Sequence, residues 1–64
     1  MDSPSAYLTH DNRLGFVLAT NSGEVKYIEQ QNAPGAKDEQ GKPKNTDFWK
    51  DANSKPQWRS LGHP

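Results

Sequence analysis

The fold is decided by residues 14–30, which read Leu-Gly-Phe-Val-Leu-Ala-Thr-Asn-Ser-Gly-Glu-Val-Lys-Tyr-Ile-Glu-Gln. Two runs with the composition of β-strands lie on either side of Asn21-Ser22-Gly23. A three-residue loop of this kind favours a type I turn followed by a residue in the left-handed region, which glycine enters freely. The sequence therefore predicts a β-hairpin with Gly23 at the left-handed position.

The length of this loop also fixes which residues of the hairpin face each other. We expect Thr20 opposite Glu24 and Val17 opposite Tyr27. Because side chains alternate along a strand, one face of the hairpin carries Leu14, Phe16, Leu18 and Ile28. The other face carries Val17, Ala19, Val25 and Tyr27. Neither face is polar, so we expect the hairpin to pack against something on both sides.

A further strand is expected upstream, because residues 5–9 favour β structure and His10-Asp11-Asn12 supplies turn-forming residues. The predicted fold class is mainly β: a small three-stranded antiparallel meander, with barrel-like closure as an alternative. The predicted strands are Ser5–His10, Arg13–Thr20 and Glu24–Gln30. The third strand would be an edge, where Lys26 discourages pairing with other chains.

The remainder of the chain is divided by composition. Residues 31–45 contain no large apolar side chain, two prolines and two glycines, and are predicted to be a flexible linker or long loop after a meander at 1–30. Residues 46–64 are predicted to be a short helical turn at Thr46–Asn53, with Thr46 as its N-cap, followed by a basic aromatic tail. The tail is either docked on the sheet or partly disordered. No internal repeat is expected.

Size and composition limit what the chain can build. It has 64 residues, of which 30% are hydrophobic, and no cysteine. We therefore expect one small domain with a marginal core and no disulfide, which fits a reducing cytoplasm, or the host cytoplasm if the protein is viral. The N-terminal Met1-Asp2-Ser3-Pro4 lacks the features of a signal peptide, and no membrane association is expected.

The neutral overall charge hides two halves of opposite sign. Residues 1–41 hold three basic and six acidic residues, a net of −3, whereas residues 42–64 hold five basic and two acidic ones, a net of +3. The basic half also holds both tryptophans. Aromatic and cationic side chains are common anchors of interfaces, so the candidate partner-binding residues are Tyr27, Phe48, Trp49, Lys50, Lys55, Trp58 and Arg59.

The aromatic residues of the basic half have two interpretations. Phe48, Trp49 and Trp58 either cover the sheet face of Phe16, Leu18 and Ile28 and complete the core, or they lie exposed and contact a partner. The expected core contains Phe16, Val17, Leu18, Tyr27, Ile28 and one or both tryptophans.

Catalytic and metal-binding chemistry finds little support in the sequence. His10 next to Asp11 resembles a base and its orienting carboxylate, but neighbouring turn residues seldom point at each other. His10, His63, Asp2 and Asp11 offer metal ligands without a characteristic spacing. We expect no catalytic residue, no metal and no cofactor.

The function expected from these features is a non-enzymatic protein-binding module that modulates a larger partner and is a monomer when free. Very short, cysteine-free chains of this type include phage- or plasmid-encoded inhibitors of a host machine such as RNA polymerase. The alternative is a protein that binds single-stranded nucleic acid through the basic aromatic C-terminal segment, with aromatic rings stacking on bases and lysines contacting phosphates. A third hypothesis is a structural component of a virion, whose sheet edge pairs with copies of itself.

Overall fold

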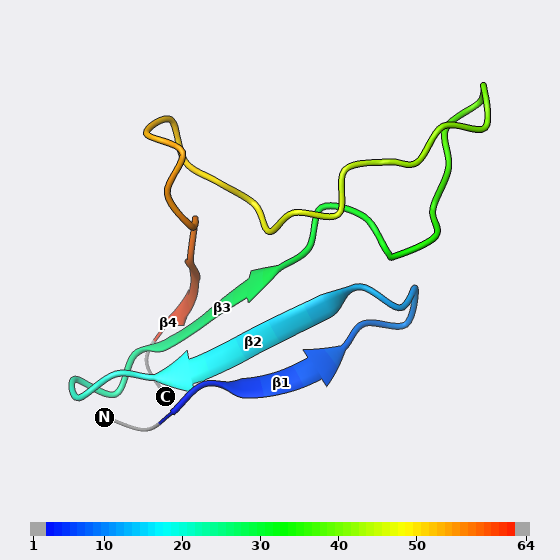
Figure 1. The fold of residues 1–64 in the computed structure, drawn as a ribbon. Coiled ribbons are helices and arrows are strands. Elements are labelled where there is room, and N and C mark those ends of the chain that lie inside the picture. Colours follow the sequence, from blue (N-terminus) through cyan, green and yellow to red (C-terminus); the bar gives the residue numbers. More distant parts are fainter. Residues whose placement is uncertain (1–2, 63–64) are drawn as a thin grey trace.

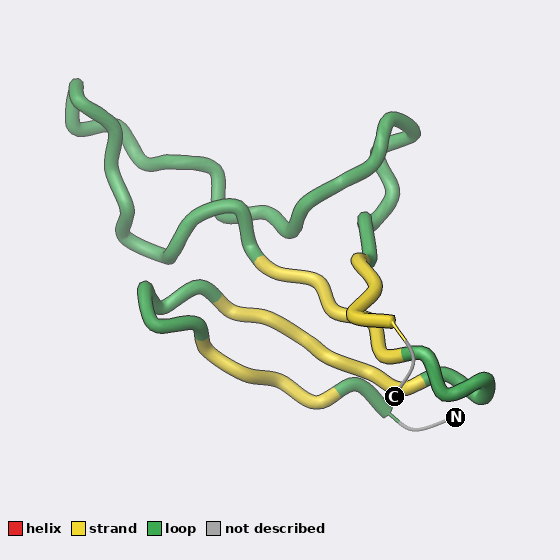
Figure 2. The backbone as a smooth tube through the Cα atoms, turned by 180° about the vertical axis from the view of Figure 1, so that it is seen from behind, coloured by secondary structure: helices red, strands yellow, loops and turns green. Residues whose placement is uncertain are grey.

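The protein forms one open antiparallel β-sheet. The computed structural model describes residues 3–62, which contain four strands in the spatial order β1-β2-β3-β4. Their bounds are β1 Ser5–Leu8, β2 Leu14–Ala19, β3 Val25–Glu29 and β4 Arg59–Gly62. Figures 1 and 2 show the strands side by side, with the long connection from β3 to β4 extending beyond one end of the sheet. The mainly β class is confirmed.

The central hairpin has the predicted register. Val17 lies opposite Tyr27 and Phe16 opposite Ile28. The loop is closed by the Thr20 N–H, which donates to the Glu24 carbonyl at 2.8 Å. Gly23 has φ 87°, so it occupies the left-handed position that the sequence predicted.

The β1–β2 turn repeats the same geometry. The Thr9 N–H donates to the Arg13 carbonyl at 2.9 Å, and Asn12 takes the left-handed position with φ 65°. The Thr9 hydroxyl accepts a hydrogen bond from the Arg13 N–H at 2.9 Å. Asparagine tolerates this backbone conformation better than most residues, which explains why the turn forms without a glycine.

The prediction of three strands and barrel-like closure is corrected by β4. β4 pairs with β3 at Lys26↔Ser60 and Tyr27↔Arg59, so β3 is not an edge strand. The backbone groups of β3 that point away from β2 thereby gain partners, which outweighs the deterrent effect expected of Lys26. The sheet does not close, because β1 and β4 lie at opposite edges.

The helical turn predicted at Thr46–Asn53 is wrong, since none of residues 3–62 lies in a helix. The Trp49 N–H donates to the Glu29 carbonyl at 3.2 Å, and the Gln31 N–H donates to the Asp47 carbonyl at 2.8 Å. Phe48 thus forms a β-bridge with Gln30. Extended backbone here continues the pairing along β3, and a helix would remove these cross-strand bonds.

An internal repeat, which sequence reasoning missed, lies within the β3–β4 connection. The pattern Lys-Asp-x-x-(Gly or Ser)-Lys-Pro occurs at residues 37–43 and again at residues 50–56. Each copy closes a hairpin through one bridge, Lys37↔Pro43 in the first and Lys50↔Pro56 in the second. In Figure 1 these hairpins form the green-yellow and orange excursions away from the sheet.

The two hairpins share their hydrogen bonds position by position. The Asp38 carboxylate accepts from the Lys42 N–H at 2.9 Å, and the Asp51 carboxylate accepts from the Lys55 N–H at 3.1 Å. The left-handed position is occupied by Gly41 in the first copy (φ 79°) and by Ser54 in the second (φ 62°). The segment predicted as a flexible linker therefore contains one such hairpin, while its mobility stays a prediction.

Very little of the molecule is a core. Ile28, with 5% of its surface exposed, is the one buried hydrophobic side chain among residues 3–62. The ring of Phe48 packs on Phe16 with centroids 5.7 Å apart. The radius of gyration is 13.7 Å, against about 10.7 Å for a compact chain of this length. The principal extents of 45 × 27 × 17 Å describe a thin, single-layered body.

Because the two hairpins share one geometry, substitutions at their left-handed residues should have opposite effects on hairpin stability. Ser54→Gly removes the strain of a side chain in that conformation and should stabilise its hairpin by about 1 kcal/mol, whereas Gly41→Ala should destabilise the other hairpin by a similar amount. The N–H groups of Asp38 and Asp51 close the two turns, so their hydrogen exchange reports on each hairpin. Exchange at Asp51 should slow roughly fivefold in Ser54→Gly, and exchange at Asp38 should become roughly fivefold faster in Gly41→Ala. Equal responses of the two hairpins would contradict the repeat.

Candidate functional site: the Tyr27 face of the sheet

One face of the sheet carries two adjoining hollows. We call it the Tyr27 face, because strand alternation places Tyr27 at its centre. The smaller hollow, of about 210 Å³, is lined by Arg13, Tyr27, Ile28, Glu29, Trp49, Gln57 and Arg59. The larger, of about 500 Å³, is lined by Tyr7, Val17, Tyr27, Glu29 and Leu61. Tyr27 and Glu29 belong to both and join the hollows into one site.

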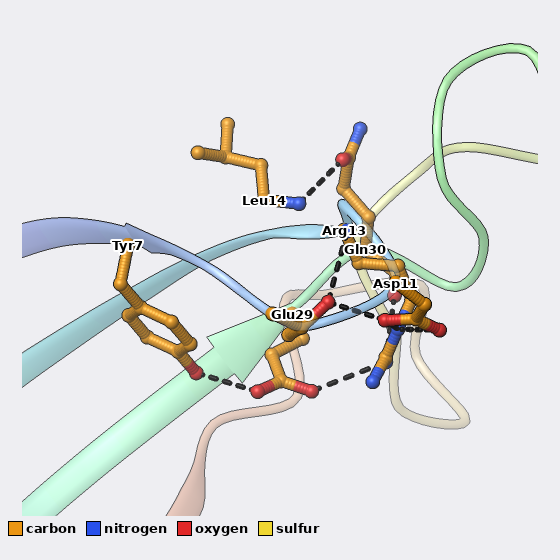
Figure 3. Close-up of polar contacts among 7 residues, drawn as sticks. Tyr7, Asp11, Arg13, Leu14, Glu29 and Gln30 are labelled. Carbon is orange, nitrogen blue, oxygen red and sulfur yellow. Dashed lines mark hydrogen bonds and ion pairs between the residues drawn. The ribbon is translucent and has the colours of Figure 1, made fainter.

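Glu29 is held between two partners at the edge of both hollows. Its Oε2 accepts a hydrogen bond from the Tyr7 hydroxyl at 2.7 Å, and its Oε1 lies 3.1 Å from Nη1 of Arg13. Arg13 also donates through Nε to both carboxylate oxygens of Asp11 at 3.1 Å. Figure 3 shows this chain of contacts from Tyr7 on β1 through Glu29 on β3 to the turn that holds Arg13. Arg13 is thus paired with both carboxylates of the cluster.

The surroundings of this cluster shift the pKa values of three of its members. Burial of the ring, and next the hydrogen bond to Glu29, raise the pKa of Tyr7 from 10.0 to about 12. The pKa of Asp11 is lowered by hydrogen bonds from Thr9 and Arg13, and the pKa of Arg13 is raised by its hydrogen bond with Asp11. At neutral pH the Tyr7 hydroxyl therefore keeps its proton and donates a hydrogen bond to the Glu29 carboxylate.

Gly15 leaves the space in which the Tyr7 ring lies. The two residues are directly paired between β1 and β2. A Cβ on Gly15 would lie 2.7 Å from the Tyr7 hydroxyl oxygen and 2.8 Å from Cε2, well inside van der Waals contact. Gly15 thus has a steric role, since it lets Tyr7 lie across β2 and reach Glu29.

The Gln30 side chain connects the end of the sheet to the extended segment that contains Trp49. Its Oε1 accepts from the Leu14 N–H at 2.8 Å, and its Nε2 donates to the Thr46 carbonyl at 2.9 Å. One side chain therefore connects β2 to the residues just before Phe48. This explains how a segment with little buried surface keeps a defined position.

The structure brings together three of the seven residues predicted to bind a partner. Tyr27, Trp49 and Arg59 line the smaller hollow, although they come from three separate segments. The Trp49 side chain is 44% exposed. Pairing of β4 and of residues 47–49 with the same edge of β3 causes this convergence.

The other four predicted residues lie elsewhere. Phe48 packs on Phe16, on the opposite face. Lys50 lies 3.8 Å from the Asp47 carboxylate, and Lys55 closes the second hairpin through its backbone. Trp58 is 36% exposed and lines neither hollow. Of the two interpretations offered for the aromatic residues, core packing describes Phe48, and exposure describes Trp49 and in part Trp58.

Sequence reasoning missed several residues of this site. Arg13, Glu29, Gln57 and Leu61 line the hollows but were not singled out. The alternation of β3 alone would have placed Glu29 beside Tyr27. Gln57 and Leu61 become visible only once the tail is paired as a strand.

Arg59 differs from Arg13 in having a free charge. No hydrogen bond or ion pair joins its side chain to any residue within 3–62. Arg59 lines a hollow that is also lined by Trp49, Tyr27 and Gln57. Such a group is suited to an acidic or carbonyl group of a bound molecule.

The described residues that were considered for catalysis and metal binding lie apart from the two hollows. His10 lies exposed in the β1–β2 turn, where Asp11 bonds to Thr9 and Arg13. No group of three or more histidines and acidic residues able to hold a metal occurs in the described part of the chain. Asp2 and His63 lie outside the described residues. Within 3–62 there is also no helix of the length and apolarity needed to cross a membrane.

Comparisons with models of known protein families, with curated proteins and with solved structures find no match to this chain.

The contact between Gly15 and Tyr7 predicts strong coupling between two substitutions. Gly15→Ala should cost about 1–3 kcal/mol, because the new methyl group displaces the ring. In a Tyr7→Ala background the same change should be neutral or slightly stabilising, since alanine orders more readily than glycine. A double-mutant cycle by urea unfolding measures the coupling, and additive effects would refute the steric role.

The raised pKa of Tyr7 predicts a loss of stability at high pH. The folded protein holds this proton more tightly than the unfolded chain, so the contribution is complete below pH 10 and disappears as the pH rises toward about 12. Tyr7→Phe should cost about 1 kcal/mol near neutral pH, a value reduced by solvent screening. The stabilities of the two proteins should converge as the pH approaches 12, whereas a constant gap would contradict the assignment.

Proposed function

We propose that this chain is a small, non-enzymatic protein-binding module that docks on a larger protein through the Tyr27 face and modulates it. The observation that carries the proposal is the gathering of Tyr27, Trp49 and Arg59 around one hollow. Tryptophan, tyrosine and arginine are the residues most enriched among the energetic anchors of protein interfaces. The hollow gives such anchors the concave setting in which an inserted side chain is desolvated.

The amount of exposed surface also supports a docking role. The accessible area of the chain is 4878 Å², about 750 Å² more than expected for a compact protein of its mass. One partner of a standard interface buries about 800 Å². Large apolar side chains remain exposed, with Leu61 67% exposed beside the larger hollow. A partner would supply the second layer that this sheet lacks.

The distribution of charge favours a protein over a nucleic acid. No lysine lines either hollow, and Lys50 and Lys55 belong to the projecting second hairpin. The lysines are therefore separated from the aromatic rings, and Arg59 is the one cation lining the hollow that has no ion-pair partner among residues 3–62. Single-stranded nucleic acid instead needs a row of cations and aromatic faces along one path. The nucleic-acid alternative is retained as an outcome of the test.

The chemistry of the site supports the non-enzymatic part of the proposal. Glu29 is the one carboxylate among the described residues that line the hollows. Both of its oxygens have partners, in Tyr7 and Arg13. A general base needs an oxygen free to take a proton from substrate.

The two exposed tryptophans provide a matched test. The tagged chain captures partners from a lysate of its native host, and the captured protein is purified for calorimetry. Trp49→Ala should weaken binding by at least about 30-fold, because it removes an anchor from the hollow. Trp58→Ala, a similar loss of exposed indole outside the hollows, should change the affinity by less than about threefold.

Each remaining outcome has a defined meaning. If Trp58→Ala abolishes binding and Trp49→Ala does not, the Tyr27 face is not the docking surface. Binding of a labelled single-stranded oligonucleotide that weakens steeply with salt would establish the nucleic-acid alternative instead. The identity of the captured protein tests the narrower hypothesis of an inhibitor of a host machine such as RNA polymerase.

A further inference from the structure

The two edges of the sheet differ in their protection against strand pairing. β4 carries the charge of Arg59, ends at Gly62 with φ 91°, and has an irregular register against β3. Charges and bulges are features with which proteins block edge-to-edge association. β1 reads Ser-Ala-Tyr-Leu, with no charge, no proline and a regular register against β2. It is an open edge.

The outward-facing backbone groups of β1 follow from its pairing with β2. The bond from the Thr9 N–H to the Arg13 carbonyl makes this pair hydrogen-bonded. Hydrogen-bonded pairs alternate along an antiparallel ladder, so Tyr7 and Ser5 also point their backbone groups at β2. Ala6 and Leu8 therefore direct their N–H and C=O groups away from the sheet, where Figures 1 and 2 show no other strand.

We infer that β1 pairs with β1 of a second copy of this chain, antiparallel about a two-fold axis at Tyr7. Ala6 of one copy then bonds reciprocally with Leu8 of the other, which gives four intermolecular hydrogen bonds and leaves no outward group of either residue unpaired. A register centred on Ala6 would instead place Leu8 opposite Pro4, which has no N–H. The edge is thus self-complementary in the register centred on Tyr7.

Side chains and charge support a second copy as the occupant. Leu8 is 66% exposed and lies beside Leu14 of β2, and in the dimer it would also lie beside Ala6 of the second copy. The Tyr7 ring does not obstruct the two-fold axis, because it lies over Gly15 and reaches Glu29. The formal net charge is zero, so no long-range repulsion opposes association.

The contact area sets the strength of the dimer. Four residues a side make an interface well below the size of stable complexes, so the dissociation constant should be on the order of 0.1–1 mM. The chain would be a monomer at micromolar concentrations, as expected from the sequence, and would dimerise where its local concentration is high. Because the axis is perpendicular to the sheet, the dimer presents two Tyr27 faces on the same side.

The test compares two equally exposed leucines on opposite edges. NMR diffusion and sedimentation of the whole chain, from about 0.02 to 2 mM, should show a monomer–dimer equilibrium. Leu8→Lys, which adds a charge to each β1, should weaken it at least tenfold, whereas Leu61→Lys on β4 should leave it within about twofold. Ala6→Pro removes an outward N–H without removing a bond to β2 and should have the same effect as Leu8→Lys.

Hydrogen exchange locates the contact independently of folding. Exchange of the Ala6 and Leu8 amides should slow as the protein concentration rises, while that of Thr9, already bonded to Arg13, should not. A constant diffusion coefficient over the whole range would overturn the inference. So would a dimer that Leu8→Lys does not weaken, or one in which the Ala6 and Leu8 amides show no added protection.

Discussion

The structure depends on backbone pairing along both sides of β3. On one side β3 bonds to β2 through the hairpin, and on the other it bonds to β4 and to residues 47–49. With Ile28 as the buried hydrophobic side chain of the described chain, apolar burial alone cannot order these segments. Main-chain hydrogen bonds and tight turns fix the chain where a core would ordinarily do so.

One turn geometry makes this pairing feasible. Thr9, Thr20, Asp38 and Asp51 each open a loop closed by a bond from their own N–H to the carbonyl four residues later. Each loop has one left-handed residue at its fourth position. Such short loops limit the entropy lost on closure. This matters because lost chain entropy is the main opponent of folding when so few contacts are buried.

Local patterns made the central hairpin predictable, because its turn and its register depend on adjacent residues. Gly23 and the alternation of residues 14–29 were sufficient to place Val17 against Tyr27. β4 and the segment before Phe48 could not be predicted in this way. Their extended backbone is stabilised by β3, which is distant in sequence, and local propensity favoured a helical turn over Thr46–Asn53 instead.

The candidate site shows the same division. Tyr27, Trp49 and Arg59 were recognised as anchor types from composition, but composition cannot separate Trp49 from Trp58 or Arg59 from Lys55. Their grouping depends on the pairing of β3 with β4 and with residues 47–49. The Lys-Asp repeat was present in the sequence and was missed because its two copies differ at all three intervening positions and are joined by unrelated residues.

The two faces and the two edges of the sheet differ in how far they are open to contacts with other molecules. The face opposite the Tyr27 face carries Phe16 and is partly covered by Phe48 of the chain itself. The β4 edge carries a charge and has an irregular register, both of which oppose strand pairing. The Tyr27 face and the β1 edge lack such protection, and they do not compete, because one contact uses side chains and the other uses outward backbone groups. A sheet of this thickness can therefore bind a partner through its face while its edge pairs with a second copy. Binding at one of them need not prevent binding at the other, so a larger partner that gathers several chains would raise their local concentration and favour pairing at β1.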